Sequence, residues 1–507
     1  MDITSFYFLC FYAVLLLLYY VLPRRLQWPL LLAGSLFIYG APWHRILLIW
    51  PLAACLVTYG AALLIRRTGS SDEKRGLRRA ILIADIAVLI GILIGFKYVR
   101  YGRAIDVPYG LSFYTFALVG YVVDVYNEIA EPQKNPARVG LYGMYFPLMV
   151  SGPVLRFRED AGQFYEPHRF SYENLTFGLQ RMLYGFFKKL VIAERAGVIA
   201  GAVFNSYTAD SDLPYGGAAV WLGILMFTIQ LYTDFSGCMD IVLGLSETFG
   251  LRLPENFRTP FYAKTIAEYW RRWHITLGVW MKEYVFYPLL RSSLFTKLGK
   301  ALRAKCGKKA GKQLATFAAM FLLWFLIGLW HGGDVKYVIG SGLLHWFYIV
   351  FGEATLPFFT RWNKKLHIPM EGRAADAFRV IRTFILVNIG NTFFRAASAG
   401  TAVRILAGGF SSRGKSMLAG EGIGQLGLDR IEWLLLIFSV LVLMVFSFIQ
   451  HRDELAGLDD THAIRRRIAA LPLIPRWVFW FAALFFVILF GQYGPGYTAA
   501  EFIYQGF

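Results

Sequence analysis

The chain has 507 residues, of which 57% are hydrophobic, 17% aromatic and only 17% charged. This composition excludes an ordinary soluble protein and is typical of a chain that crosses a membrane several times. The formal net charge of +19 comes from short lysine and arginine runs between apolar segments, so it indicates cytoplasmic loops and excludes a nucleic-acid-binding domain.

Apolar runs that approach the roughly 20 residues of a membrane-spanning helix recur along the chain. The first run shows no evident cleavage site and is expected to remain as the first helix. We therefore expect an all-α polytopic membrane protein with about ten to twelve transmembrane helices. The runs cover residues 3–22, 28–41, 45–65, 80–98, 176–204, 217–246, 314–330, 336–352, 377–394, 431–449 and 477–492.

Two further apolar stretches, 107–126 and 141–155, are shorter or broken by glycine and are expected to be re-entrant. Non-helical backbone survives at membrane depth only where protein or a water-filled cavity satisfies its polar groups. These stretches therefore predict that part of the chain lines a path through the interior of the protein. Because we see no internal repeat, residues 1–507 are expected to form one membrane domain.

Three basic segments predict the orientation of the chain. Arg66–Arg79, Arg291–Lys312 and the arginines at 465–467 are expected to be polar loops that face the cytoplasm. The stretch Ser398–Leu428 is rich in glycine and serine and only mildly charged, which favours the other side of the membrane. Its length leaves room for a short helix.

The cysteines do not indicate a disulfide framework or a metal site. None of them has CxxC or other metal-type spacing, and three lie in apolar stretches. We expect no metal and no bound cofactor. The four residues are Cys10, Cys55, Cys238 and Cys306.

Polar side chains gather within the apolar run 217–246, at Tyr232, Asp234, Ser236 and Asp240. Carboxylates in such surroundings are normally paired. We expect a structural ion pair here more than direct catalysis. The candidate partners are Arg252, Arg258 and Arg271.

The segment Thr265–Leu290 carries an aromatic pattern at alternating steps of three and four, which predicts one face of a helix at the membrane interface. His274 lies one residue off this face, beside Arg271. It can be a member of an interfacial hydrogen-bond network or a group that orients substrate, and periodicity alone does not separate the two. The pattern consists of Trp270, Trp273, Leu277, Trp280 and Tyr284.

His331 ends a nearly uninterrupted apolar run and is followed by Gly332 and Gly333, which permit close approach of a ligand or backbone. A neutral imidazole can take a proton from a hydroxyl group as that group attacks an activated acyl group. The alternative is an interfacial histidine that only hydrogen-bonds a loop. His345, in the next apolar run, is expected to be structural.

Several motifs in this order resemble the membrane-bound O-acyltransferase family, in particular the bacterial branch that O-acetylates alginate or transfers D-alanine to teichoic acid. The most specific are Trp270–Leu277 and Gly328–Gly332. The others are Pro108–Phe116, Phe146–Pro147 with Ser151–Pro153, Tyr232–Asp240, Asn256–Pro260 and Phe393–Ala396.

The resemblance implies helices around a central funnel, with His331 as the catalytic residue and His274 as the second histidine of the site. It implies no nucleotide or metal cofactor. The matched motifs supply further candidates for binding substrate or lining the tunnel. These are Trp270, Arg271, Trp273, Trp330, Asp234, Ser236, Asn256 and Tyr232.

The function that these observations favour is transfer of an acetyl group from a cytoplasmic thioester, acetyl-CoA or an acyl carrier protein, for O-acetylation of an extracellular or cell-envelope polysaccharide. The expected setting is the bacterial cytoplasmic membrane, with contacts to lipid and to an extracellular or membrane-anchored acyltransferase partner. One alternative is D-alanyl transfer to teichoic acid from a carrier protein. Another class is a transporter or export channel in which buried histidines and aspartates relay protons.

The motif Trp330-His331-Gly332 continues here with Gly333-Asp334, where alginate-type relatives usually have alanine. The lead-in Tyr142–Tyr145 is also less apolar than the family pattern. Neither departure affects the proposed chemistry, but both weaken the prediction of which polymer is the acceptor.

Overall fold

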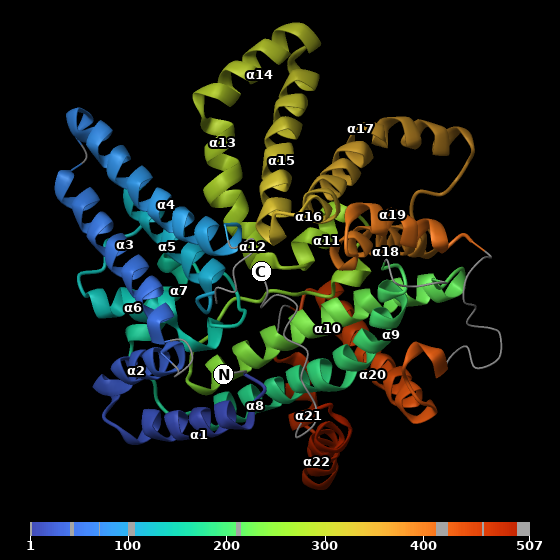
Figure 1. Cartoon of the computed structure of the whole chain (residues 1–507), viewed down its shortest axis with the longest axis horizontal. Coiled ribbons are helices and arrows are strands. Elements are labelled where there is room, and N and C mark those ends of the chain that lie inside the picture. The colour runs from blue at the N-terminus through green and yellow to red at the C-terminus, as the bar shows by residue number, and fades with distance from the viewer. Residues whose placement is uncertain are drawn as a thin grey trace. The chain divides into compact units, whose positions relative to one another are not determined.

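The computed structural model describes residues 3–40, 45–69, 71–99, 107–208, 214–411, 424–458 and 461–493. Every regular element in these ranges is a helix (Figure 1), and Phe257 and Trp273 form an isolated antiparallel β-bridge. The prediction of an all-α, multi-pass membrane protein is confirmed.

The helices form two compact units. The first contains the residues up to Phe186 together with Gly237–Glu255, and the second contains Phe187–Ser236 and the described residues from Asn256 onward. The chain passes from the second unit to the first within one continuous helix, α10 (Ala218–Thr248). The expectation of a single domain therefore stays a prediction.

In the first unit, α3, α4 and α5 pack against one another, and α6 packs against α2 and α3. The end of α10 lies so close to α8 that a Cβ on Gly244 would come within 2.5 Å of the Gly178 carbonyl oxygen. Small residues at such crossings let membrane helices approach closely. The helices are α1 (Phe6–Val21), α2 (Gln27–Tyr39), α3 (Ile49–Thr68), α4 (Arg75–Lys97), α5 (Leu111–Tyr126), α6 (Pro136–Met144), α7 (Phe157–Tyr165) and α8 (Tyr172–Phe186).

The second unit holds the histidine motifs. Its hairpin of α14 and α15 is visible in Figure 1, and the π-helical segment η8 packs between α15 and α18. The helices are α9 (Glu194–Asn205), α11 (Ile266–Arg272), α12 (Ile275–Met281), α13 (Tyr287–Arg291), α14 (Ser293–Cys306), α15 (Lys308–Gly332), α16 (Val335–Tyr337), α17 (Leu344–Lys365), α18 (Arg373–Arg395), α19 (Ala399–Gly408), α20 (Arg430–Leu455), α21 (Ala463–Ala469) and α22 (Leu473–Phe490). The π-helical segments are η5 (Phe187–Ala193), η7 (Lys282–Phe286) and η8 (Val338–Leu343).

Within the described residues, 7 helical segments are long and apolar enough to cross a membrane. Two shorter apolar helices, α1 and α5, add to these. The number is lower than about ten to twelve, because the run 28–41 forms the short helix α2 and because α18 carries several charged residues. The run 176–204 is divided among α8, η5 and α9. The seven are Ile46–Thr68, Asp72–Lys97, Ala218–Thr248, Lys308–Gly332, Val335–Lys365, Arg430–Leu455 and Leu473–Phe490.

The polar segments can be compared with their expected form. The expectation of loops is wrong for Arg66–Arg79, most of which belongs to α3, η3 (Asp72–Lys74) and α4, and for the arginines at 465–467, which lie in α21. The expectation of a loop over Arg291–Lys312 is wrong, because Ser292 caps a helix there and α14 follows. Ser398–Leu428 does contain the expected short helix, α19, whereas residues 412–423 of that stretch lie outside the described residues.

Candidate active site

His331 is the penultimate residue of α15 and is buried, with 3% of its surface exposed. The helix ends because Gly333 adopts a left-handed conformation, with φ of 72°, and its N–H returns to the Leu329 carbonyl at 3.0 Å. A Cβ on Gly332 would come within 2.5 Å of the Tyr337 ring. Both glycines are therefore required by the turn that follows the histidine.

The imidazole of His331 lies among aromatic rings. Its centroid is 4.8 Å from that of Trp330 and 5.5 Å from that of Phe394, which belongs to α18. The Trp330 ring also lies 6.2 Å from the ring of His274. Trp330 thus connects the two histidines that the sequence singled out.

His274 occupies the break between α11 and α12, where it is the N-cap residue with φ of 47° and ψ of 51°. It is buried, and its Nδ1 lies 3.2 Å from the Asn256 side-chain oxygen. Because that oxygen only accepts hydrogen bonds, Nδ1 carries the proton and Nε2 is the basic nitrogen. Burial lowers the pKa of His274 to about 3, so the ring stays neutral near pH 7.

Asn256 holds this arrangement through one oxygen. The same Oδ1 accepts hydrogen bonds from the Thr276 N–H at 3.1 Å and the Thr276 hydroxyl at 2.9 Å. The Asn256 carbonyl accepts from the Ile275 N–H at 3.0 Å. Asn256 therefore positions His274.

Replacing Asn256 by alanine is expected to destabilise the protein by about 1–3 kcal/mol, because buried donors of Thr276 and His274 lose their acceptor. Thermal unfolding of the purified protein in detergent measures the change. Asn205→Ala, which replaces an exposed asparagine at the end of α9, is the matched control and should unfold like the wild type. Equal losses in the two variants would contradict this role.

The expected single aromatic face over Thr265–Leu290 is wrong, because the left-handed conformation of His274 divides the segment into two helices. Trp273 is buried against Phe257, with ring centroids 5.0 Å apart. Trp270 instead faces Trp324 at 5.1 Å and His345 at 4.9 Å. Trp273 and Trp270 therefore pack against different groups of aromatic side chains.

The expected ion pairing on α10 is confirmed, but with other partners. Asp234 accepts a hydrogen bond from the Lys189 ammonium at 2.7 Å, and Lys189 also pairs with Glu194 at 2.9 Å. Asp240, on the part of α10 in the first unit, pairs with Arg181 at 3.0 Å. The arginines that the sequence suggested are not these partners.

Ser236 and Tyr232 both contact a second buried lysine. The Lys188 ammonium donates to the Ser236 hydroxyl at 2.9 Å and lies 5.9 Å from the centre of the Tyr232 ring. Sequence reasoning missed Lys188 and Lys189, although two lysines inside an apolar run are the signal that would have found them.

Tyr232, Ser236 and Asp234 lie on the same helix as Phe235, whose ring centroid is 4.9 Å from that of His274. The ion pair therefore anchors the wall against which His274 packs. Among the described residues, no group of three or more histidine, cysteine or acidic side chains could hold a metal ion.

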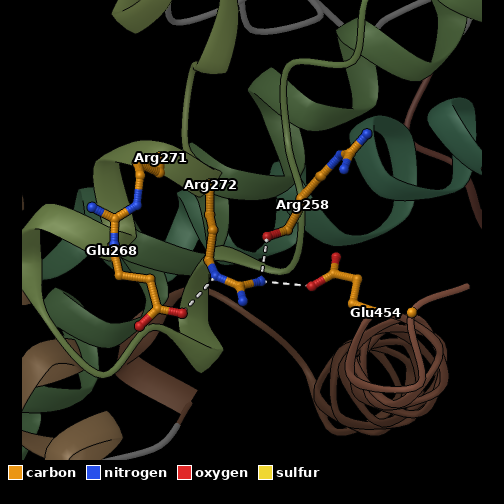
Figure 2. A pocket seen from close by; sticks show the side chains of 6 residues that line it. Arg258, Glu268, Arg271, Arg272 and Glu454 are labelled. Carbon is orange, nitrogen blue, oxygen red and sulfur yellow. Dashed lines mark hydrogen bonds and ion pairs between the residues drawn. The ribbon is translucent and has the colours of Figure 1, made fainter. Parts of the chain in front are cut away.

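A cavity of about 460 Å³ lies beside Arg271 and Arg272, the last two residues of α11. Figure 2 shows the side chains that line it. Arg271 is one of its lining residues. Arg272 crosses the cavity wall, with its guanidinium between the carboxylates of Glu268 and Glu454, at 3.0 and 2.6 Å. Among the described residues, its lining is formed by Arg258, Glu268, Arg271, Arg272, Glu454 and Gly457.

Comparison with known proteins identifies relatives of this chain. A family model described as MBOAT, membrane-bound O-acyltransferase family, matches residues 134–303. The chain is 31% identical over 458 residues to the probable alginate O-acetylase AlgI of Azotobacter vinelandii, which covers 86% of this chain and 83% of that protein.

Two further relatives act on other polymers, according to their names. The peptidoglycan O-acetyltransferase of Helicobacter pylori is 27% identical over 459 residues, covering 82% of this chain and 80% of its own. The teichoic acid D-alanyltransferase of Bacillus subtilis is 27% identical over 292 residues, covering 56% of this chain and 68% of its own.

Proposed function

Because the chain belongs to the membrane-bound O-acyltransferase family and is therefore an O-acyltransferase, we propose that it transfers acetyl groups from a cytoplasmic thioester for O-acetylation of a cell-envelope polysaccharide. The observation that carries the proposal is the buried pair of histidines joined by Trp330. The names of the relatives supply the acetyl group and the class of acceptor.

His331 is the general base in this proposal. It accepts the proton of the acceptor hydroxyl as that oxygen attacks the thioester carbonyl, and the carbon–sulfur bond then breaks to release the thiol. Burial of the imidazole among Trp330 and Phe394 supports this role, since a site that excludes water also protects the thioester from hydrolysis.

His274 is a positioning residue that presents Nε2 from a fixed ring. Its Nδ1–H is held by Asn256, so the ring cannot turn without losing that hydrogen bond. A neutral ring with one fixed acceptor nitrogen can orient the acceptor hydroxyl or the thiol while His331 moves the proton.

The proposed setting is the cytoplasmic membrane of a bacterium, where the thioester is made on one side and the polysaccharide lies on the other. The acceptor is either the polysaccharide or a side chain of an extracellular or membrane-anchored acyltransferase that completes the transfer. The weakly buried helices α20 and α22 would face lipid, with 17% and 6% of their apolar windows buried within the chain.

Thioester turnover tests the proposal. Purified protein would be given acetyl-CoA with and without extracted envelope polysaccharide, and both thiol release and acetate on the polymer would be measured. Acetate on the polymer supports the proposal, and D-alanine from a charged carrier protein in place of acetate would overturn it. Substrate movement across vesicles without thioester cleavage would indicate a transporter.

A further inference from the structure

Arg395 is a half-buried arginine close to His331. It is the last residue of α18 and directly follows Phe394, whose ring centroid is 5.5 Å from that of His331. Within the described part of the chain, its guanidinium makes no hydrogen bond and no ion pair. A partly desolvated charge without a counterion is costly. Arg395 therefore fits an anion that the described residues do not supply.

A second cation lies next to Arg395. Lys336 belongs to α16, which packs against α18 and α19. Its ammonium donates to the Ala396 carbonyl at 2.7 Å and lies 4.7 Å from the centre of the Tyr337 ring. Because Ala396 follows Arg395, the two positive charges are near enough to repel each other. An anion bound by both cations would offset this repulsion.

Both cations border Tyr337, whose ring packs beside the histidine motif. The Arg395 guanidinium is within electrostatic range of the Tyr337 hydroxyl group. The Tyr337 ring centroid is 5.3 Å from that of Phe394, and a Cβ on Gly332 would come within 2.5 Å of the ring. Gly332 directly follows His331. The two cations therefore belong to the surroundings of the proposed base.

Asp334 is the acidic side chain of the same turn. One of its carboxylate oxygens caps α16 by accepting the backbone N–H of Lys336 at 3.2 Å. Its negative charge offsets part of the positive charge at Lys336. Two cations and one carboxylate leave one excess positive charge. This balance suits a ligand group with a single negative charge.

The two cations lie on the side of the membrane from which the acceptor comes. Helix α15 begins at Lys308 within a run of exposed lysines, and the positive-inside rule places that end in the cytoplasm. His331 and α16 follow at the other end of α15, which is long and apolar enough to cross a membrane. The same rule makes basic residues scarce on that side. A pair of them there indicates a ligand, and the donor thioester is on the opposite side.

We propose that Arg395 and Lys336 bind a carboxylate of the acceptor polysaccharide and so hold one of its hydroxyl groups at His331. This inference rests on the proposed function and names the acceptor as an acidic polysaccharide. A guanidinium binds a carboxylate through two parallel hydrogen bonds. A uronate sugar carries a carboxylate and hydroxyl groups on one ring. Since the Cα atoms of Phe394 and Arg395 are about 3.8 Å apart, the bound carboxylate and the reacting hydroxyl can belong to the same or to neighbouring sugars.

The test compares a charged acceptor with its neutral ester. An oligouronate and the same oligosaccharide with methyl-esterified carboxylates are given to the purified wild type, Arg395→Gln, Arg395→Lys and Arg404→Gln, and acetyl transfer is measured. Arg404 is an exposed arginine of α19 whose guanidinium already donates to the Tyr207 carbonyl at 3.2 Å. Its variant controls for the loss of one positive charge.

We expect Arg395→Gln to raise KM for the oligouronate by about 10- to 100-fold with little change in kcat, since a charge-assisted hydrogen-bonded pair is lost. Arg395→Lys should recover part of this loss, and Arg404→Gln should resemble the wild type. KM for the ester should be high in all four proteins and equal among them. The oligouronate should also raise the melting temperature of the wild type more than that of Arg395→Gln.

Three results would overturn the inference while the proposed function stands. One is an equal rise in KM for both acceptors in Arg395→Gln, which indicates a structural role. Another is an unchanged KM for the oligouronate in that variant, which indicates that the guanidinium contacts lipid phosphates. The third is a preference for a glycerol phosphate polymer over the oligouronate that depends on Arg395.

Failure of the proposed function would look different. The wild type would then acetylate neither oligosaccharide nor envelope polysaccharide, whereas the oligouronate would still raise its melting temperature more than that of Arg395→Gln. Absence of both acetyl transfer and this difference in melting temperature would overturn the function and the inference together.

Discussion

Replacing His331 by alanine is expected to reduce thioester turnover by about 100- to 10,000-fold, the usual contribution of a positioned base. The imidazole is buried at the end of α15, and its contacts with Trp330 and Phe394 leave little freedom for water to take its place. Release of free CoA from acetyl-CoA in the presence of polysaccharide measures the loss.

The matched control is His367→Asn, which changes an exposed histidine outside the membrane-spanning helices. Asparagine tolerates the left-handed conformation at this position, where φ is 54°. Its turnover should equal that of the wild type. Unchanged turnover in a His331→Ala protein that elutes and melts like the wild type would refute the assignment of His331 as the base.

The position of His331 was predictable because its signals are local. A long apolar run followed by two glycines predicts a membrane helix that ends at the histidine, and α15 does end there. Burial at the helix end follows from the same run. The sequence also predicted that Asp234 forms an ion pair, because a carboxylate in an apolar helix requires a cation.

The identity of that cation was not predictable, since Lys189 and Asp234 are 45 positions apart and only the packing of helices joins them. The same holds for the cavity, where Arg272 meets Glu454 across 182 positions. In both cases the local sequence pattern identifies one residue of the pair, and only the tertiary structure shows which distant residue is its partner.

The break at His274 could not be predicted from the sequence for a different reason. The aromatic spacing from Trp270 to Tyr284 fits one helix, and a left-handed histidine leaves no mark on hydrophobic periodicity. The strain of that conformation is offset by hydrogen bonds that join Asn256 to His274 at the break and to Thr276 in the helix that follows. Backbone strain held in this way is common at functional sites.

Replacing Lys189 by methionine is expected to destabilise the protein by about 3–5 kcal/mol, since it leaves the buried carboxylates of Asp234 and Glu194 without their shared cation. Thermal unfolding in detergent would measure the change. Lys264→Met is the matched control, because its ion pair with Asp376 is exposed and should contribute much less.

A double variant separates loss of charge balance from loss of packing. In Lys189→Met with Asp234→Leu, one unbalanced carboxylate is removed, so this protein should be more stable than Lys189→Met alone. Additive destabilisation would contradict the ion-pair explanation. Because Phe235 neighbours Asp234 and packs on His274, recovery of stability in the double variant should be accompanied by recovery of thioester turnover if the pair acts only by anchoring α10.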